Sequence, residues 1–171
     1  RSPLPRAAVQ AFLDVYSNPA LSWEHLATLR DRTTLPVLVK GILHPDDARR
    51  ALDIGMDGIV VSNHGGRQVD GAIASLDALP AIADAVGDEL AVLFDSGVRS
   101  GADALKALAL GADAVCLGRP YVWGLALDGQ AGVEAVLKMI LAELDLTMAL
   151  CGLTRPEEIG PGLLAGASSG S

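Results

Sequence analysis

Four short aliphatic runs alternate with helix-length segments between residues 36 and 118, and this alternation constrains the fold more than any other feature. Strands covered on both faces read as nearly continuous Val, Ile and Leu, whereas strands with one solvated face alternate with polar residues. Parallel strands need a long crossover, and each intervening segment is long enough to supply a helix. The pattern predicts an α/β fold with about four parallel strands. The predicted strands span residues 36–40, 57–63, 90–97 and 113–118.

The segments between these runs carry the start and stop signals of helices. Pro45 begins one segment and Gly55 ends it, while Ser100 precedes another that ends at Gly111. Proline is tolerated in the first helical turn, serine caps helix N-termini, and glycine is common just after the last turn. After the fourth run, apolar residues recur at helical spacing and predict one long amphipathic helix. The predicted helices span residues 46–55, 75–86, 102–111 and 132–152.

The chain also matches itself at an offset of about 56 residues, in a register shared by helix, turn and strand. This register predicts a repeated βαβα unit and favours a (β/α)8 barrel over an open doubly wound sheet. A complete barrel needs about 250 residues and eight strands. We therefore expect the C-terminal half of a TIM barrel. The coincident pairs are Gly41/Gly97, Asp47/Asp103, Ala48/Ala104, Ala51/Ala107, Leu52/Leu108, Gly55/Gly111 and Asp57/Asp113.

Three segments follow from these patterns. Residues 1–35 read as a helical segment that leads into the barrel, with Ser22 as its candidate N-cap. Residues 36–160 form the half-barrel, and the glycine-rich residues 161–171 read as a flexible tail. Because only about four of the eight strands are visible, we expect the N-terminal half of the barrel to lie on another chain or on sequence outside this one. The start at Arg1 rather than Met suggests a processed chain or a fragment.

Charge and composition argue against several function classes. The formal charge of −8 and the isoelectric point near 4.7 argue against nucleic-acid binding, which relies on clustered Lys and Arg. No apolar run approaches the roughly 20 residues of a membrane span. Cys116 and Cys151 have neither disulfide nor metal-ligand spacing, so we expect a cytoplasmic protein with inert thiols and no metal site.

Polar and charged residues stand at the end of every predicted strand. Functional sites form at the carboxyl ends of the strands in barrels and in open parallel sheets, so these side chains should converge on one rim. The first strand ends in Lys40, the second in Ser62, His64 and Arg67, the third in Asp95, Ser96 and Gly97, and the fourth in Gly118 and Arg119.

His64 and Arg67 together suggest chemistry on a small carboxylic acid. Histidine is the side chain that most readily exchanges a proton near neutral pH, and a guanidinium grips a carboxylate through two parallel hydrogen bonds. Gly65 and Gly66 allow a tight loop between them. A single loop histidine is more often a surface hydrogen-bonding residue, but the pair at a strand end favours a base beside a carboxylate clamp.

Lys40 and the glycine-rich loops point to an anionic ligand. A partly buried lysine needs a partner, which is either a ligand or Asp95 on a neighbouring strand. Two further arginines, Arg99 and Arg119, accompany open backbone N–H groups and the positive end of the helix that begins near Gly101. The phosphate site of a barrel commonly follows the seventh and eighth strands. The predicted strands over residues 90–97 and 113–118 would therefore be the last two strands of the barrel.

Four motifs resemble consecutive signatures of the FMN-dependent L-2-hydroxy-acid oxidase and dehydrogenase family. They are VLVKGI, SNHGGRQ, FDSGVRSGADALKALALGAD and LGRP, and the resemblance covers roughly residues 20 to 160. Within the family, GILHPDDA, GRPYVWGLALDG and the DSG in place of the commoner DGG look most similar to lactate 2-monooxygenase.

The resemblance implies a role for each site residue. Lys40 would stabilise the reduced flavin, His64 would be the base, Arg67 would clamp the substrate carboxylate, and Ser62 would bond the flavin. The family's remaining active-site groups, including two tyrosines and a second arginine, lie on the N-terminal half of the barrel. The FMN-binding segment would comprise Asp95, Ser96, Gly97, Arg99, Gly118 and Arg119.

The expected function is therefore FMN-dependent oxidation of an L-2-hydroxy acid, with L-lactate as the substrate, giving pyruvate or, by oxidative decarboxylation, acetate. The alternative is a half-barrel that binds a phosphate ligand, or associates with itself, without catalysis. A half-barrel exposes two sheet edges and an apolar face, so we also expect a homo-oligomer.

Overall fold

The computed structural model describes residues 5–16 and 18–165, and the chain divides into two compact units, residues 1–35 and 36–171. The first unit contains α1 (Pro5–Tyr16) and α2 (Trp23–Arg30). Ser22 is the N-cap of α2, as the sequence predicts, and its backbone N–H donates to Nδ1 of His25 at 3.1 Å.

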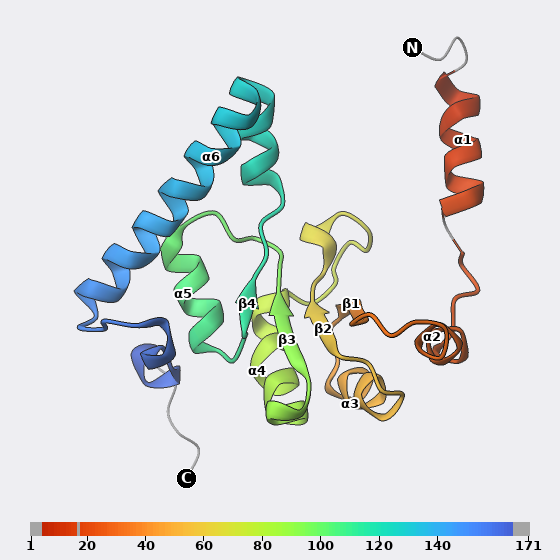
Figure 1. Cartoon of the computed structure of the whole chain (residues 1–171), viewed down its shortest axis with the longest axis horizontal. Coiled ribbons are helices and arrows are strands. Elements are labelled where there is room, and N and C mark those ends of the chain that lie inside the picture. Colours follow the sequence, from red (N-terminus) through yellow and green to blue (C-terminus); the bar gives the residue numbers. More distant parts are fainter. Residues whose placement is uncertain (1–4, 17, 166–171) are drawn as a thin grey trace. The chain divides into compact units, whose positions relative to one another are not determined.

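The second unit contains a four-stranded parallel sheet with the strand order β1-β2-β3-β4 (Figure 1). Each strand lies where the sequence predicts one, with the ends shifted by a few residues because ladder hydrogen bonds, rather than side-chain pattern, define them. The strands are β1 (Leu38–Ile42), β2 (Gly58–Val61), β3 (Ala91–Phe94) and β4 (Ala114–Val115).

The strand order decides between the two architectures. Every strand pairs with the next strand in the sequence, so the sheet always advances in one direction. Right-handed crossovers then place all connecting helices on the same face of the sheet. A doubly wound sheet reverses its order and carries helices on both faces. The doubly wound alternative is therefore wrong, and the four strands form part of a (β/α)8 barrel.

Three helices cover the outer face of the sheet: α3 (Pro45–Asp53), α4 (Ser75–Val86) and α5 (Gly101–Ala109). Alternate side chains of each strand point to opposite faces, and in β2 and β3 one set is buried. Burying each of these apolar side chains contributes roughly 1.5–3 kcal/mol. The buried strand residues beneath the helices are Ile59, Val61, Val92 and Phe94.

The inner face of the sheet carries Lys40 beside two apolar residues. Lys40 pairs in register with Val60, and Val60 pairs with Leu93, so the three side chains lie side by side across the sheet. Val60 and Leu93 are half-buried. Because the alternation places residues 62 and 95 on this same face, the next row of the inner face is polar.

The internal repeat is visible as matched hydrogen bonds at the start of two strands. Oδ2 of Asp57 accepts the backbone N–H of Val37 at 2.7 Å, and Oδ2 of Asp113 accepts that of Val92 at the same distance. Each aspartate thus ties the start of one strand to the preceding strand. Positive φ angles recur at the paired glycines Gly41, Gly55, Gly97 and Gly111.

The last helix is longer than its apolar periodicity predicts. It is α6 (Arg119–Leu150), which packs along α5, and it breaks at Asp128 and Gly129 into two segments that fold back on each other (Figure 1). The backbones of Gly124 and Gly132 meet directly at this fold, where a Cβ on either residue would overlap the other's carbonyl. The first segment lacks a sequence signal because Gly-Arg-Pro reads as a loop, although proline is well tolerated in a first helical turn.

The described residues of the second unit also form four short 3-10 helices: η1 (His64–Gly66), η2 (Gly87–Glu89), η3 (Pro156–Glu158) and η4 (Pro161–Leu163). The predicted tail over 161–171 therefore includes η4, and its residues 166–171 lie outside the described part of the chain. None of the described helices combines the length and apolar character needed to cross a membrane.

Candidate active site

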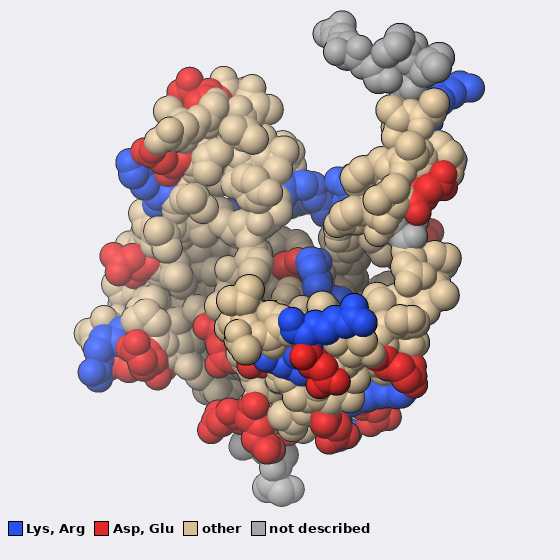
Figure 2. Space-filling view, turned by 45° about the vertical axis from the view of Figure 1, so that its right-hand side comes forward, with Lys and Arg blue, Asp and Glu red and all other residues tan. Residues whose placement is uncertain are grey.

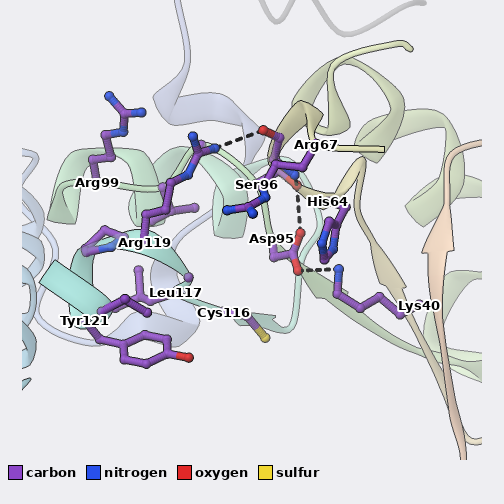
Figure 3. Close-up of a pocket in the computed structure, with 16 residues that line it drawn as sticks. Lys40, His64, Arg67, Asp95, Ser96, Arg99, Cys116, Leu117, Arg119 and Tyr121 are labelled. Atoms are coloured by element: carbon purple, nitrogen blue, oxygen red, sulfur yellow. Dashed lines mark hydrogen bonds and ion pairs between the residues drawn. The ribbon is translucent and has the colours of Figure 1, made fainter. Parts of the chain in front are cut away.

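A pocket of about 320 Å³ lies at the carboxyl ends of the four strands (Figure 3). Its walls come from the ends of the strands, from η1 and from the first turn of α6. The rim predicted from the sequence is thus a continuous cavity. Among the predicted site residues, those that line it are Lys40, His64, Arg67, Asp95, Ser96, Gly97, Arg99, Gly118 and Arg119.

The pocket concentrates positive charge in an acidic chain. Lys40, Arg67, Arg99 and Arg119 line it together with a single carboxylate, Asp95, whereas the whole chain has a formal charge of −8. Figure 2 shows many acidic side chains toward the bottom of the view, the end of the sheet at which the strands begin. Four cationic side chains against one carboxylate favour an anionic ligand in the pocket.

A compact polar network joins three strand ends beneath the pocket. Nζ of Lys40 lies 2.8 Å from Oδ2 of Asp95 and donates to the Ser62 hydroxyl at 2.6 Å, and this hydroxyl donates to Oδ1 of Asp95 at 2.5 Å. Ser62 is 2% exposed and lies behind the pocket wall, so its predicted contact with a flavin stays a prediction. An ammonium has three donors, so the bonds to Asp95 and Ser62 leave one N–H of Lys40 for a ligand.

Asp95 is held in its ionised form. Burial raises the pKa of Asp95, but hydrogen bonds from Lys40, Ser62 and Ser96, together with the charge of Lys40, outweigh burial and keep the pKa below its usual value. The carboxylate is therefore charged at neutral pH and accepts hydrogen bonds from two hydroxyls through Oδ1.

The loop with the candidate base adopts an unfavourable backbone conformation. His64 has a φ of 56°, in the left-handed region that L residues seldom occupy. Its backbone N–H donates to the Ser62 hydroxyl at 3.0 Å, and the next N–H, that of Gly65, donates to the Ser96 hydroxyl at 3.0 Å. Strained residues of this kind cluster at functional sites, where surrounding contacts hold them in place.

Two residues without a predicted role support the same loop. The side chain of Asn63 caps η1 by accepting a hydrogen bond from the backbone N–H of Gly66 at 3.1 Å. The backbone N–H of Asn63 donates to the hydroxyl of Ser75 at 2.9 Å. Ser75 is 2% exposed at the start of α4. No motif in the sequence identified this pairing, because it joins residues on two different elements.

Arg119 bridges the end of β4 to the loop of His64. Its Nη2 donates to the carbonyl of Gly65 at 2.9 Å (Figure 3), and a Cβ at Gly65 would lie 2.6 Å from the same nitrogen. A second arginine, Arg99, lies with its guanidinium 5.8 Å from the ring centroid of Trp123, within the range of a cation–π contact.

The start of α5 differs from the sequence-based interpretation. The predicted anion site uses the positive end of this helix, but the Gly101 N–H donates to Oε2 of Glu143 at 2.9 Å. The Asp103 carboxylate accepts the backbone N–H groups of Arg99 and Ser100, each at 3.1 Å. Protein carboxylates therefore occupy this helix end. The helix that begins in the pocket wall is α6, with Gly118 as its N-cap.

Comparison with known proteins agrees with this geometry. The family model described as FMN-dependent dehydrogenase matches residues 2–166. The chain belongs to this family.

Relatives of the chain act on different 2-hydroxy acids, according to their names. The L-lactate oxidase of Lysinibacillus sphaericus is 58% identical over 149 residues, which cover 87% of this chain and 39% of the relative. An FMN-dependent alpha-hydroxy acid dehydrogenase of Penicillium citrinum is 54% identical over 146 residues, covering 85% and 36%. A crystal structure of mandelate oxidase superposes with a TM-score of 0.80 at 49% identity, over 86% of this chain and 43% of that one. The chain thus spans about two-fifths of the length of these proteins.

The residues of the pocket fit FMN, the cofactor of this family. Arg99 and Arg119 supply charge for a phosphate, and Cβ atoms at Gly97 and Gly118 would meet nothing within 4 Å, so the backbone there is open to close approach. The only carboxylate in the lining, Asp95, is already paired with Lys40 and does not repel an anion.

Further residues line the pocket although no sequence signal assigned them a role. Cys116, predicted to be an inert thiol, is half-buried in the pocket wall; burial and the charge of Asp95 raise its pKa, which keeps the thiol neutral. The first turn of α6 brings in Tyr121, whose side chain is partly exposed. The other added residues are Val98, Leu117, Pro120 and Val122, and Gly65 of the predicted tight loop also lines the pocket.

Proposed function

We propose that this chain provides the FMN-binding wall of an enzyme that oxidises an L-2-hydroxy acid, and that the acid is L-lactate. The observation that carries the proposal is the placement of His64 and Arg67 on one short loop beside the Lys40–Asp95 pair, at the mouth of a cationic pocket. Family membership and the name of the L-lactate oxidase relative support the reaction type.

The cofactor is held by charge and by open backbone. Arg99, Arg119 and the backbone at Gly97 and Gly118 would hold the phosphate, and the remaining N–H of Lys40 would stabilise negative charge on the bound cofactor. When bound, FMN accepts the two electrons that the hydroxy acid loses. Asp95 keeps the Lys40 side chain in place through the ion pair, because the Asp95 carboxylate stays ionised.

The substrate is bound and deprotonated by the loop of η1. Arg67 pairs with the carboxylate through two parallel hydrogen bonds and thereby orients C2 of the hydroxy acid. His64 accepts the proton at an imidazole nitrogen, which requires the ring to reach hydrogen-bond distance of the substrate. The remaining walls of the substrate site come from the N-terminal half of the barrel, on another chain or on sequence outside this one.

The test combines this chain with the N-terminal part of the barrel, FMN and L-lactate without oxygen. Bleaching of the flavin absorbance is the expected result, and a His64→Ala variant that retains FMN should bleach at least about a hundredfold more slowly. Bleaching by mandelate or glycolate but not by L-lactate would overturn the choice of substrate. A complex that binds FMN yet is bleached by none of these acids would overturn the proposed reaction.

Product analysis under oxygen then separates two outcomes of the same oxidation. Pyruvate with hydrogen peroxide indicates an oxidase, whereas acetate with carbon dioxide indicates oxidative decarboxylation of the lactate 2-monooxygenase type. The resemblance of GILHPDDA and GRPYVWGLALDG to that enzyme favours the second outcome.

The open sheet favours one further candidate, a self-associating half-barrel without catalysis. Within the described residues, β1 and β4 each pair along one edge only, and Leu38 on β1 is 40% exposed. Unpaired strand edges promote association. Sedimentation of this chain alone with added FMN distinguishes the two candidates. A colourless oligomer supports the self-associating half-barrel. A yellow, FMN-bound chain that also associates with the N-terminal part of the barrel supports the enzyme.

A further inference from the structure

Ser96 occupies a backbone conformation that favours glycine. Its φ is 89°, and the following residue, Gly97, has a φ of 85°. A side chain at such a φ strains the backbone, whereas glycine adopts it freely. Only two non-glycine residues in the described chain have a positive φ, Ser96 and His64, and they lie in the same pocket.

The hydroxyl of Ser96 is hydrogen-bonded to two groups. It donates to Oδ1 of Asp95 at 2.7 Å and accepts the backbone N–H of Gly65 at 3.0 Å. The hydroxyl of Ser62 is engaged in the same way, since it donates to Oδ1 of Asp95 and accepts the N–H of His64. Two serines therefore connect one carboxylate to two consecutive peptide groups of the loop.

These two contacts define the backbone of His64. The angles φ and ψ of a residue are set by the orientations of the peptide groups before and after it. The N–H of His64 belongs to the first of these groups and the N–H of Gly65 to the second. Arg119 holds the next peptide group through the Gly65 carbonyl. The loop is thus held from the ends of three strands.

We propose that Ser96 is a positioning residue for the base, which sets the direction of the His64 side chain by holding the Gly65 peptide to Asp95. The effect of Ser96 on catalysis rests on the proposed function. The hydrogen bond between Ser96 and the Gly65 peptide is independent of that function. A glycine at position 96 would remove the strain and the hydroxyl together, whereas alanine would remove the hydroxyl alone.

The first experiment measures amide hydrogen exchange at Gly65 in this chain, as the wild type and as Ser96→Gly and Ser96→Ala. Both variants should exchange the Gly65 amide about tenfold faster, because each loses one hydrogen bond to a polarised acceptor. The thermal midpoint of Ser96→Gly should stay the same or rise as the backbone strain is released. Unchanged exchange at Gly65 in both variants would overturn the proposal.

Two serine variants serve as matched controls. Ser62→Ala should accelerate exchange at His64 more than at Gly65, because Ser62 holds the other peptide group. Ser100→Ala removes the N-cap of α5 and should lower the thermal midpoint without a selective effect on Gly65. If Ser100→Ala accelerates Gly65 exchange as much as Ser96→Gly does, the effect is general loosening and the proposal fails.

The second experiment measures flavin reduction in the enzyme completed with the N-terminal part of the barrel. Ser96→Gly should lower the limiting rate of reduction by L-lactate about tenfold while the FMN dissociation constant changes less than about threefold. Loss of FMN affinity with an unchanged limiting rate would identify Ser96 as a cofactor contact and overturn the positioning role. If wild type is not reduced by any hydroxy acid, the proposed function fails while the exchange result still decides the loop contact.

Discussion

Lys40 and Asp95 form an ion pair between strands that are not neighbours. Lys40 is on β1 and Asp95 follows β3, yet Nζ and Oδ2 are 2.8 Å apart because both side chains reach over the end of β2. The hydroxyl of Ser62, just after β2, completes the contact from below. The ion pair therefore forms only when β1, β2 and β3 are packed together correctly.

Replacing Asp95 by asparagine should lower the free energy of unfolding by about 1–2 kcal/mol. The loss is smaller than the roughly 3–5 kcal/mol of a fully buried pair because the Lys40 side chain is 46% exposed and stays solvated. Urea denaturation measures the change. Glu134→Gln, which removes the exposed pair with Lys138 on α6, is the control and should have no measurable effect. Equal effects of the two variants would contradict the prediction.

The Asp95 contribution should disappear in acid. The folded-state pKa of Asp95 lies below the ordinary value of 3.8, so its stabilising effect is fully present above that value and is lost as the pH falls through the folded-state pKa. Thermal midpoints recorded from pH 7 downward should therefore differ between wild type and Asp95→Asn by a constant amount until about pH 4. Below that pH the two curves should converge, and a gap that widens in acid would exclude the assigned cause.

Gly65→Ala should destabilise the chain more than Gly66→Ala. Both glycines have a positive φ, 65° and 70°, so each substitution strains the backbone by about 1 kcal/mol. Only at Gly65 would the added Cβ lie 2.6 Å from Nη2 of Arg119, whereas nothing lies within 4 Å at Gly66. Denaturant titrations of both variants measure the difference.

The excess cost at Gly65 should vanish when Arg119 is absent. A double-mutant cycle of Gly65→Ala with Arg119→Ala should show a coupling energy of about 0.5–3 kcal/mol, since the two groups are in contact. Additive effects would mean that Arg119 does not lie over Gly65 in solution.

Cys151 should react with a thiol reagent well before Cys116. Cys151 is exposed at the end of α6, whereas Cys116 is half-buried and its pKa is raised by burial and by Asp95. Less thiolate at pH 8 means slower alkylation, and the rates are read residue by residue from mass spectra after digestion. In a Cys151→Ser variant Cys116 is the only cysteine, and only the slow alkylation should remain. Faster modification of Cys116 would contradict its placement in the pocket wall.

Local sequence signals located most of the regular structure. Continuous aliphatic runs marked the four strands, and the helix predicted over 75–86 coincides with α4. The repeat at an offset of about 56 residues corresponds to matched aspartate contacts at Asp57 and Asp113. These predictions succeed because periodicity, caps and glycine turns act over a few residues. The sequence did not predict the first segment of α6, because its start at Arg119 and Pro120 resembles a loop.

The sequence by itself determined which functional side chains lie at the strand ends. They are a lysine, a histidine with an arginine, an aspartate and two further arginines. Only the tertiary structure decided what each of them contacts. Glu143 caps the start of α5 from 42 residues away, and Ser96 holds the Gly65 peptide from 31 residues away. Such partners depend on how helices and strands pack, and packing brings together groups whose separation along the chain carries no periodic signal.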